Sequence, residues 1–267
     1  MVRDPIVAGI LYPSEPQILK KRVQRLLMEA PVIAGNAGAM ILPYGHYDNV
    51  GALIASGMKR AAAGTPKRIL LLASPSSETA EGIFVPGVSA FATPIGRLPV
   101  DEEAIARFLS AGASADDLLH LREHILEPHL PFVRHLFPSI PIVPLLVGVR
   151  DADNLQTVTR IIASLGEQFF EESLFIVSSN ISSFCEAREA TLQSKRVIGA
   201  ALAHDAARLV HSYRRSLFLE AGPIAVLCNL LASDTRASIL GRTAHHSYAD
   251  GRLFSVEHAT IVFDVKD

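Results

Sequence analysis

The chain has 267 residues, of which 49% are hydrophobic, so it is long and apolar enough to bury a large core and is not a disordered protein. Its formal net charge is −2 and its basic residues are scattered, which argues against nucleic acid as a partner because phosphate binding needs a concentrated positive surface. No apolar stretch reaches the roughly 18 to 20 residues that cross a bilayer, and residues 1–13 lack a secretory-signal pattern, so we expect no membrane association and a cytoplasmic location.

Apolar runs alternate with amphipathic segments along most of the chain. The first helix is predicted to start at Ser14, with Ser14 as N-cap and Pro16 in the first turn. Further helices are predicted at 49–63, 101–111 with Asp101 as N-cap, 152–169 and 195–212, and buried strands at 39–42, 68–73, 142–147 and 174–178. This alternation predicts a doubly wound α/β sheet in a single domain spanning 1–267.

The last part of the chain has a different pattern. His245-His246-Ser247-Tyr248 is predicted to form a turn, and residues 253–256 and 260–265 are predicted to form antiparallel strands.

Five ordered segments resemble one known family. They are Ala8-Gly9-Ile10-Leu11-Tyr12-Pro13, Pro43-Tyr44-Gly45-His46-Tyr47, Ala73-Ser74-Pro75-Ser76-Ser77, the run from Glu123 to Phe132, and the run from Ser178 to Phe184. Together they are similar to the Memo family, called AmmeMemoRadiSam system protein B in microbes, whose members are related to class III extradiol (LigB-type) dioxygenases. The resemblance extends from Ala8 to about Ala249 and implies a LigB-like fold, a largely parallel sheet with helices on both faces.

The family resemblance places a metal pocket where the predicted strands end, the usual position of a ligand crevice in an open α/β sheet. The family has a histidine where this chain has Tyr44, a second histidine at Ser77, an aspartate at Asn180, a third histidine at Ser183 and a cysteine at Ala221. Tyr47 is retained. Hydroxyl and amide groups are poor substitutes for imidazole, thiolate and carboxylate on iron or zinc, so we expect no metal cofactor.

His46 is the neighbouring imidazole that could replace the missing first ligand, although it lies two residues further along the loop. If it did so, iron or zinc would remain possible. It is therefore kept among the pocket-lining candidates with Tyr44, Tyr47 and the four substituted positions beyond them.

His124 and Glu127 match the family's His-Ser-Ile-Glu motif and are our tentative catalytic residues. Positions three apart share a face of a helical turn, so the two side chains could hydrogen-bond and carry proton chemistry. Two other interpretations remain open: a buried polar pair that satisfies backbone groups, and a metal-binding face formed together with His120.

Two functions follow from these observations. The first is a non-catalytic Memo-like module that binds an unknown small molecule or protein; the serine-rich loops at 74–77 and 178–183 would suit a polar ligand. The alternative is a divergent metal-dependent or acid/base enzyme that uses His124, Glu127, Tyr44 and His46. The family's name in microbes also suggests radical-SAM-associated proteins as partners.

Overall fold

A mixed sheet passes through the middle of the computed structural model, which describes residues 1–77, 79–216, 218 and 220–264. Within these residues the sheet has nine strands, eight of them in the order β10-β12-β2-β9-β3-β8-β4-β7, with β11 paired to β12. A small second sheet has the order β1-β5-β6. The central neighbours β2, β9, β3 and β8 are parallel, so the predicted mixed, largely parallel α/β fold is confirmed.

The strands have the following bounds: β1 Val2–Arg3, β2 Ala37–Leu42, β3 Arg68–Ala73, β4 Gly82–Val85, β5 Ala90–Thr93, β6 Gly96–Pro99, β7 Ser114–Ala115, β8 Ile142–Gly148, β9 Ser173–Ser178, β10 Cys185–Glu186, β11 Ala237–Ala249 and β12 Arg252–Asp264. The four central strands are almost completely buried, as expected for parallel strands covered on both faces.

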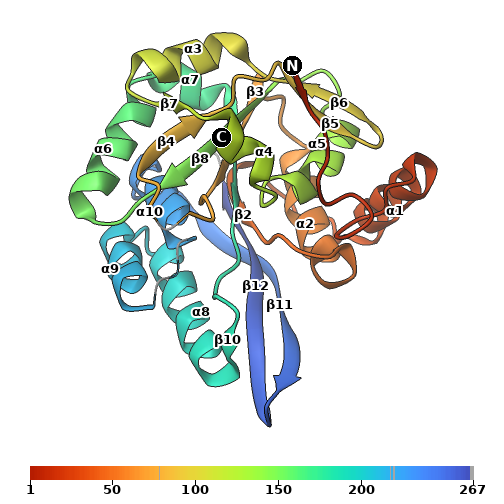
Figure 1. Cartoon of the computed structure of the whole chain (residues 1–267), viewed down its shortest axis with the longest axis vertical. Helices are drawn as coiled ribbons and strands as arrows, with labels where there is room; N and C mark the ends of the chain where they lie inside the picture. The colour runs from red at the N-terminus through yellow and green to blue at the C-terminus, as the bar shows by residue number, and fades with distance from the viewer. Residues whose placement is uncertain (78, 217, 219, 265–267) are drawn as a thin grey trace.

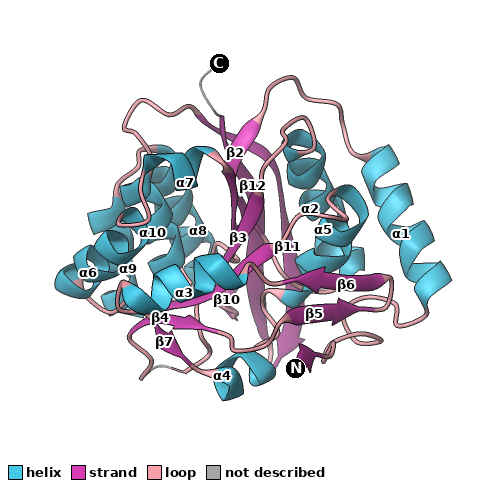
Figure 2. Ribbon diagram, turned by 90° about the horizontal axis from the view of Figure 1, so that it is seen from above, coloured by secondary structure: helices cyan, strands magenta, loops and turns pink. Residues whose placement is uncertain are grey.

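The helices have the following bounds: α1 Pro16–Glu29, α2 Tyr47–Ala61, α3 Glu102–Ser110, α4 Asp117–Arg122, the 3₁₀ turn η1 Glu127–His129, α5 Leu130–Leu136, α6 Ala152–Ala163, α7 Glu167–Glu171, α8 Ala187–Leu202, α9 Ala206–Ser216 and α10 Ala221–Leu230. Figure 2 shows the sheet between two helical layers, with α1, α2 and α5 on one side and α6, α8, α9 and α10 on the other. None of the helices in the described part of the chain has the length and apolar character that a membrane crossing requires.

Two predicted helices are each divided into two in the structure. The segment 152–169 is interrupted at Gly166, whose φ of 90° is incompatible with a continuous helix, and α7 begins after it. The segment 195–212 is interrupted at His204, a non-glycine residue with φ 54°, between α8 and α9. Neither position interrupts the apolar periodicity of the sequence, so the pattern predicts one continuous helix in each segment.

The predicted boundaries near the chain ends also need correction. The N-cap of α1 is Glu15, whose carboxylate accepts from the backbone N–H groups of Gln17 and Ile18, and not Ser14. His245 to Tyr248 form part of β11 and not a turn. The two predicted strands at 253–256 and 260–265 are one long strand, β12, and the end of the second prediction, residue 265, lies outside the described residues.

Candidate functional site

The loops that follow β2, β3 and β9 start at the same level of the sheet. Leu42 and Ala73, the last residues of β2 and β3, both align with Ser178 at the end of β9. The backbone N–H of Ser179 also donates to the carbonyl of Leu42 at 2.9 Å. We call the region formed by these three loops, the turn at 123–125 and Glu220 the crevice.

Glu220 is the group around which the crevice side chains are arranged. The Tyr44 hydroxyl donates to its Oε1 at 2.7 Å, and the backbone N–H of Asn180 donates to its Oε2 at 2.5 Å. The Ser179 hydroxyl lies 3.4 Å from the same Oε2. One carboxyl group, immediately before α10, therefore joins the loops that follow β2 and β9.

The environment of Glu220 changes its protonation. Burial raises the pKa of its carboxyl group to about 7, although hydrogen bonds from Tyr44 and Asn180 oppose the shift. Burial and the neighbouring Glu220 carboxyl also raise the pKa of the Tyr44 hydroxyl well above its ordinary value. At neutral pH Tyr44 thus remains a donor, while Glu220 exchanges between its neutral and charged forms.

Asn180 extends this hydrogen-bonded chain to β12. Its side-chain Oδ1 accepts from Nδ1 of His258 at 2.7 Å, and both residues are buried. Burial lowers the pKa of His258 to about 4, with a further contribution from His245. His258 is therefore a neutral imidazole that carries its proton on Nδ1, and it fixes the orientation of the Asn180 amide.

A second carboxylate, that of Glu123, connects the loop after β3 to the crevice. It accepts from the backbone N–H and the hydroxyl of Ser76 at 2.9 and 2.6 Å, and from the backbone N–H groups of His124 and Ile125 at 2.9 and 3.2 Å. The His124 ring lies edge-on to Tyr44, with ring centroids 6.0 Å apart, and its side chain is 41% exposed. His124 is therefore at the open side of the crevice.

Glu127 is directed away from His124, so the predicted hydrogen bond between their side chains is not formed among the described residues. Its buried carboxylate pairs with Arg3 at 2.9 Å and accepts from the Tyr12 hydroxyl at 2.7 Å. It also accepts from the backbone N–H groups of residues 6 and 7. The physical reason is that α4 ends at Arg122, so residues 123–126 form a turn and no common helical face. Glu127 alone is a buried polar group that satisfies backbone N–H groups, and His124, which is partly exposed, does not form a buried pair with it.

The possible metal-binding face that included His120 is not formed either. The Nε2 of His120 lies 3.0 Å from the carbonyl oxygen of Phe84, and burial lowers its pKa to about 4. The side chains of His120, His124 and Glu127 therefore have different partners and do not converge. Nowhere among the described residues do three His, Cys, Asp or Glu side chains come together as ligands.

Beneath the crevice, a buried pair supports the end of β9. The Ser178 hydroxyl donates to the carbonyl of Ile125 at 2.7 Å, so it accepts from Nε2 of His129 at 2.7 Å. Burial lowers the pKa of His129 to about 3, which keeps the imidazole neutral. These bonds hold the turn that carries His124 against the strand end.

His46 and Tyr47 lie at the beginning of α2. His46 is exposed at the N-cap of the helix, where its Nδ1 accepts from the backbone N–H of Asp48 at 3.2 Å. Tyr47 is buried in the core, and its hydroxyl donates to the carbonyl of Pro128 at 2.7 Å. In the described part of the chain, neither side chain forms a hydrogen bond or an ion pair with Glu220, Asn180 or Tyr44.

Of the remaining candidate positions, Ser77 and Ser183 bond to residues other than Glu220, and Ala221 lies next to Glu220. Ser77 lies 3.0 Å from the hydroxyl of Thr79, and Ser183 donates through its backbone N–H and its hydroxyl to Oε1 of Gln193, both at 3.0 Å. Ala221 is fully buried and follows Glu220 directly. Of the predicted pocket residues, the structure thus brings together Tyr44, Asn180 and Ala221 around Glu220.

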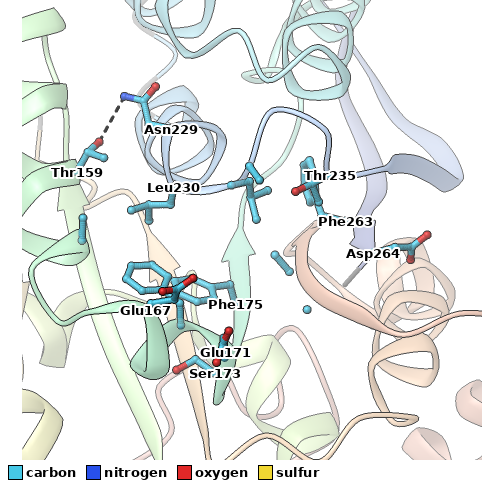
Figure 3. Close-up of a pocket in the computed structure, with 16 residues that line it drawn as sticks. Thr159, Glu167, Glu171, Ser173, Phe175, Asn229, Leu230, Thr235, Phe263 and Asp264 are labelled. Carbon is cyan, nitrogen blue, oxygen red and sulfur yellow. Dashed lines mark hydrogen bonds between the residues drawn. The ribbon is translucent and has the colours of Figure 1, made fainter. Parts of the chain in front are cut away.

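A separate cavity of about 660 Å³ lies at the opposite end of the central strands from the crevice, and Figure 3 shows its lining. It lies between the beginnings of β2 and β9 and the end of β12, and Phe175, Leu230 and Phe263 form part of its apolar wall. None of the residues predicted for the site lines it.

A family model described as Memo-like protein matches residues 3–218. The chain belongs to the Memo-like family. Similar relatives include a MEMO1 family protein from Thermotoga neapolitana, 27% identical and covering 88% of this chain and 91% of the relative. Another, from Methanopyrus kandleri, is 26% identical and covers 80% of this chain and 81% of the relative.

Among solved structures, an uncharacterized protein from Escherichia coli K12 has a similar fold. Its TM-score is 0.57 at 14% identity, and the match covers 84% of this chain and 98% of the other. At this identity the likeness concerns the fold of the Memo-like protein and not its activity.

Sequence reasoning missed four residues that organise the crevice: Glu220, Glu123, His258 and His129. Two of them were adjacent to residues that we had singled out, since Glu220 precedes Ala221 and Glu123 precedes His124. An acid next to a lost thiolate is a signal that could have been used. His129 lies within the family-like run from Glu123 to Phe132, but its partner Ser178 is distant in the sequence, and His258 lies outside all five runs.

Proposed function

We propose that this Memo-like protein binds a polar small molecule or a protein segment at the crevice, without a metal ion and without ring-cleaving activity. The observation that carries the proposal is that Glu220 is hydrogen-bonded to two of the positions where the family resemblance places metal ligands, Tyr44 and Asn180. Tyr44 bonds to the Glu220 carboxyl through its hydroxyl and Asn180 through its backbone N–H. The Asn180 side chain bonds to His258, and Ser183 bonds to Gln193.

The donor set supports the same proposal. The crevice holds the carboxylates of Glu220 and Glu123 and the imidazole of His124, but no three such ligands come together in the described residues. The other groups around Glu220 are a phenol hydroxyl, a serine hydroxyl and an amide, and the nearby imidazole of His258 is bonded to Asn180. Iron and zinc in such pockets require imidazole, thiolate or several carboxylate ligands. The residues present do not fit a metal ion of this kind.

The open side of the crevice offers contacts for a ligand. His124 is partly exposed, Ser76 is exposed, and the Tyr44 ring lies between His124 and Glu220. An imidazole, a hydroxyl group and an aromatic ring can bind a polar molecule through hydrogen bonds and ring contacts.

Metal titration tests the first half of the proposal. In anaerobic calorimetric titrations with Fe(II), and in parallel with Zn(II), we expect no stoichiometric binding tighter than about 10 µM, because too few ligands converge. With Fe(II), oxygen and catechol, we expect no ring-cleavage product.

The positive control restores the family's ligands in one variant: Tyr44→His, Ser77→His, Asn180→Asp, Ser183→His and Ala221→Cys. A gain of metal binding in this variant would show that the scaffold and the assay can report a site. Tight one-to-one binding by the unmodified chain, lost in Tyr44→Phe or His46→Ala, would contradict the proposal.

A fragment screen tests the second half. Small polar fragments that bind should shift the backbone amide NMR signals of Ser179 and Asn180, which contact Glu220. We expect His124→Ala to weaken such fragments about tenfold, as for the loss of one good hydrogen bond. His245→Ala, which removes an exposed histidine on β11, should leave the affinity unchanged; equal effects of the two variants would remove His124 from the site.

One observation favours a second function, acid/base catalysis. The pKa of Glu220, raised to about 7, is suited to proton transfer at neutral pH. This alternative predicts deuterium incorporation into carbonyl compounds with acidic α-protons in D₂O, abolished by Glu220→Gln. The binding proposal predicts no incorporation in either protein.

A further inference from the structure

The end of the β11–β12 hairpin projects from the body of the protein. We call residues 242–257 the arm; it includes the turn at Asp250 and Gly251, with φ of 49° and 72°. Figure 1 shows the arm extending past the helices that cover the sheet. From Arg242 to Ala249 every residue is exposed except Ala244, which is half-buried. The β11 half of the arm therefore buries little surface in the single chain.

One edge of the arm is open. On one side, β12 pairs with the short strand β10 through Cys185 and Glu186. On the other side, β11 has β12 as its sole strand neighbour within the described residues. The N–H and C=O groups along the outer edge of β11 therefore lack a strand partner there.

The edge also lacks the features that normally prevent strand pairing. Proteins protect exposed edges with lysine, proline, inward-facing charges or bulges. The segment Arg242-Thr243-Ala244-His245-His246-Ser247-Tyr248-Ala249 contains no lysine and no proline, and one formally charged residue. The irregularity in β11 lies earlier, between Ile239 and Gly241, so this stretch pairs regularly.

We propose that β11 pairs antiparallel with β11 of a second copy of the chain, about a two-fold axis. Antiparallel pairing of identical strands is self-complementary, because each residue meets its symmetric counterpart in both copies. The charges favour one register. Arg242 lies at one end of the segment and Asp250 lies in the turn directly after its other end, so a two-fold axis at His246 brings Arg242 of one copy opposite Asp250 of the second copy, twice.

The same register accounts for an exposed aromatic side chain. Tyr248 is 79% exposed, and in this register it lies opposite Ala244 of the second copy. An aromatic ring over a small residue buries apolar surface that the single chain leaves in water. In its own chain Arg242 lies 3.5 Å from the Glu257 carboxylate, a longer contact than the 2.7 Å between Arg252 and Glu186.

Sedimentation and hydrogen exchange on the full chain test the proposal. Between about 1 and 200 µM we expect a monomer–dimer equilibrium, because self-association depends on concentration. Amides in residues 243–249 should become protected at the higher concentration. Thr243→Lys with Ser247→Lys, which adds hydrated charges to the edge, should raise the dissociation constant at least about tenfold. Gln17→Lys with Gln24→Lys, the same charge change on the exposed face of α1, should not.

Mixing two charge variants tests the register. Arg242→Glu alone and Asp250→Lys alone should each be monomeric, because each places like charges opposite one another twice. An equimolar mixture should dimerise, because both pairs are then of opposite charge. Failure of the mixture would overturn the register centred on His246. A monomeric unmodified chain without protected edge amides, or a dimer that the edge lysines leave intact, would overturn the proposal itself.

Discussion

Replacing Glu127 with alanine is expected to lower the free energy of unfolding by about 3 to 5 kcal/mol, because it leaves a buried guanidinium without its counter-charge. Arg3 and Glu127 have side chains that are 2% and 0% exposed. The Glu127 carboxylate also accepts from Tyr12 and from two backbone N–H groups. Urea unfolding followed by circular dichroism measures the change.

Glu186 provides the matched control, since it forms an ion pair with Arg252 in which both side chains are more than half exposed. Glu186→Ala should cost less than about 1 kcal/mol. Glu127→Gln keeps one acceptor oxygen and should fall between the two alanine variants. If Glu127→Ala unfolds at the same urea concentration as Glu186→Ala, Glu127 is not the structural group described here.

The contribution of Glu220 to the stability of the protein is expected to fall as the pH rises from about 4.5 to above 7. The pKa of this carboxyl group is raised to about 7 in the folded protein, from an ordinary value near 4.5. The folded state therefore binds the proton more tightly than the unfolded state. The stabilising contribution is complete below the unfolded pKa and is lost as the pH passes the folded pKa. A pKa shift of this size corresponds to roughly 3 kcal/mol in the free energy of unfolding.

Glu220→Gln isolates this contribution, because glutamine resembles the protonated acid and does not titrate. Near pH 4.5 the variant and the unmodified protein should have similar stability, and at pH 8 the variant should be more stable. Urea midpoints across this range give the comparison. Parallel pH profiles for the two proteins would show that Glu220 titrates normally and is not enclosed as described.

The central sheet was predictable because its strands are short, continuous apolar runs. The run at 68–73 coincides with β3, and the other three predicted central strands lie within β2, β8 and β9. Helix boundaries were less predictable where a single backbone angle decides them, as at Gly166 and His204. The arm was divided into a turn and shorter strands because its polar, exposed residues give no alternating pattern on either face.

The position of the candidate site was predictable from the loops at the strand ends, and its chemistry was not. Tyr44 and Asn180 meet there, as the resemblance implied. The pairing of His124 with Glu127 was inferred from spacing along a helix that ends at Arg122. The role of Glu220 depends on burial and on partners about 40 and 176 positions away, which local pattern cannot show.

The most direct measurement is anomalous X-ray scattering at the iron and zinc edges, from crystals grown with each metal added. With Glu220 enclosed by Tyr44, Ser179 and Asn180, we predict no anomalous peak within about 2.5 Å of a crevice side-chain donor. An ordered metal peak at bonding distance from Tyr44, Asn180 or Glu220 would contradict the metal-free account.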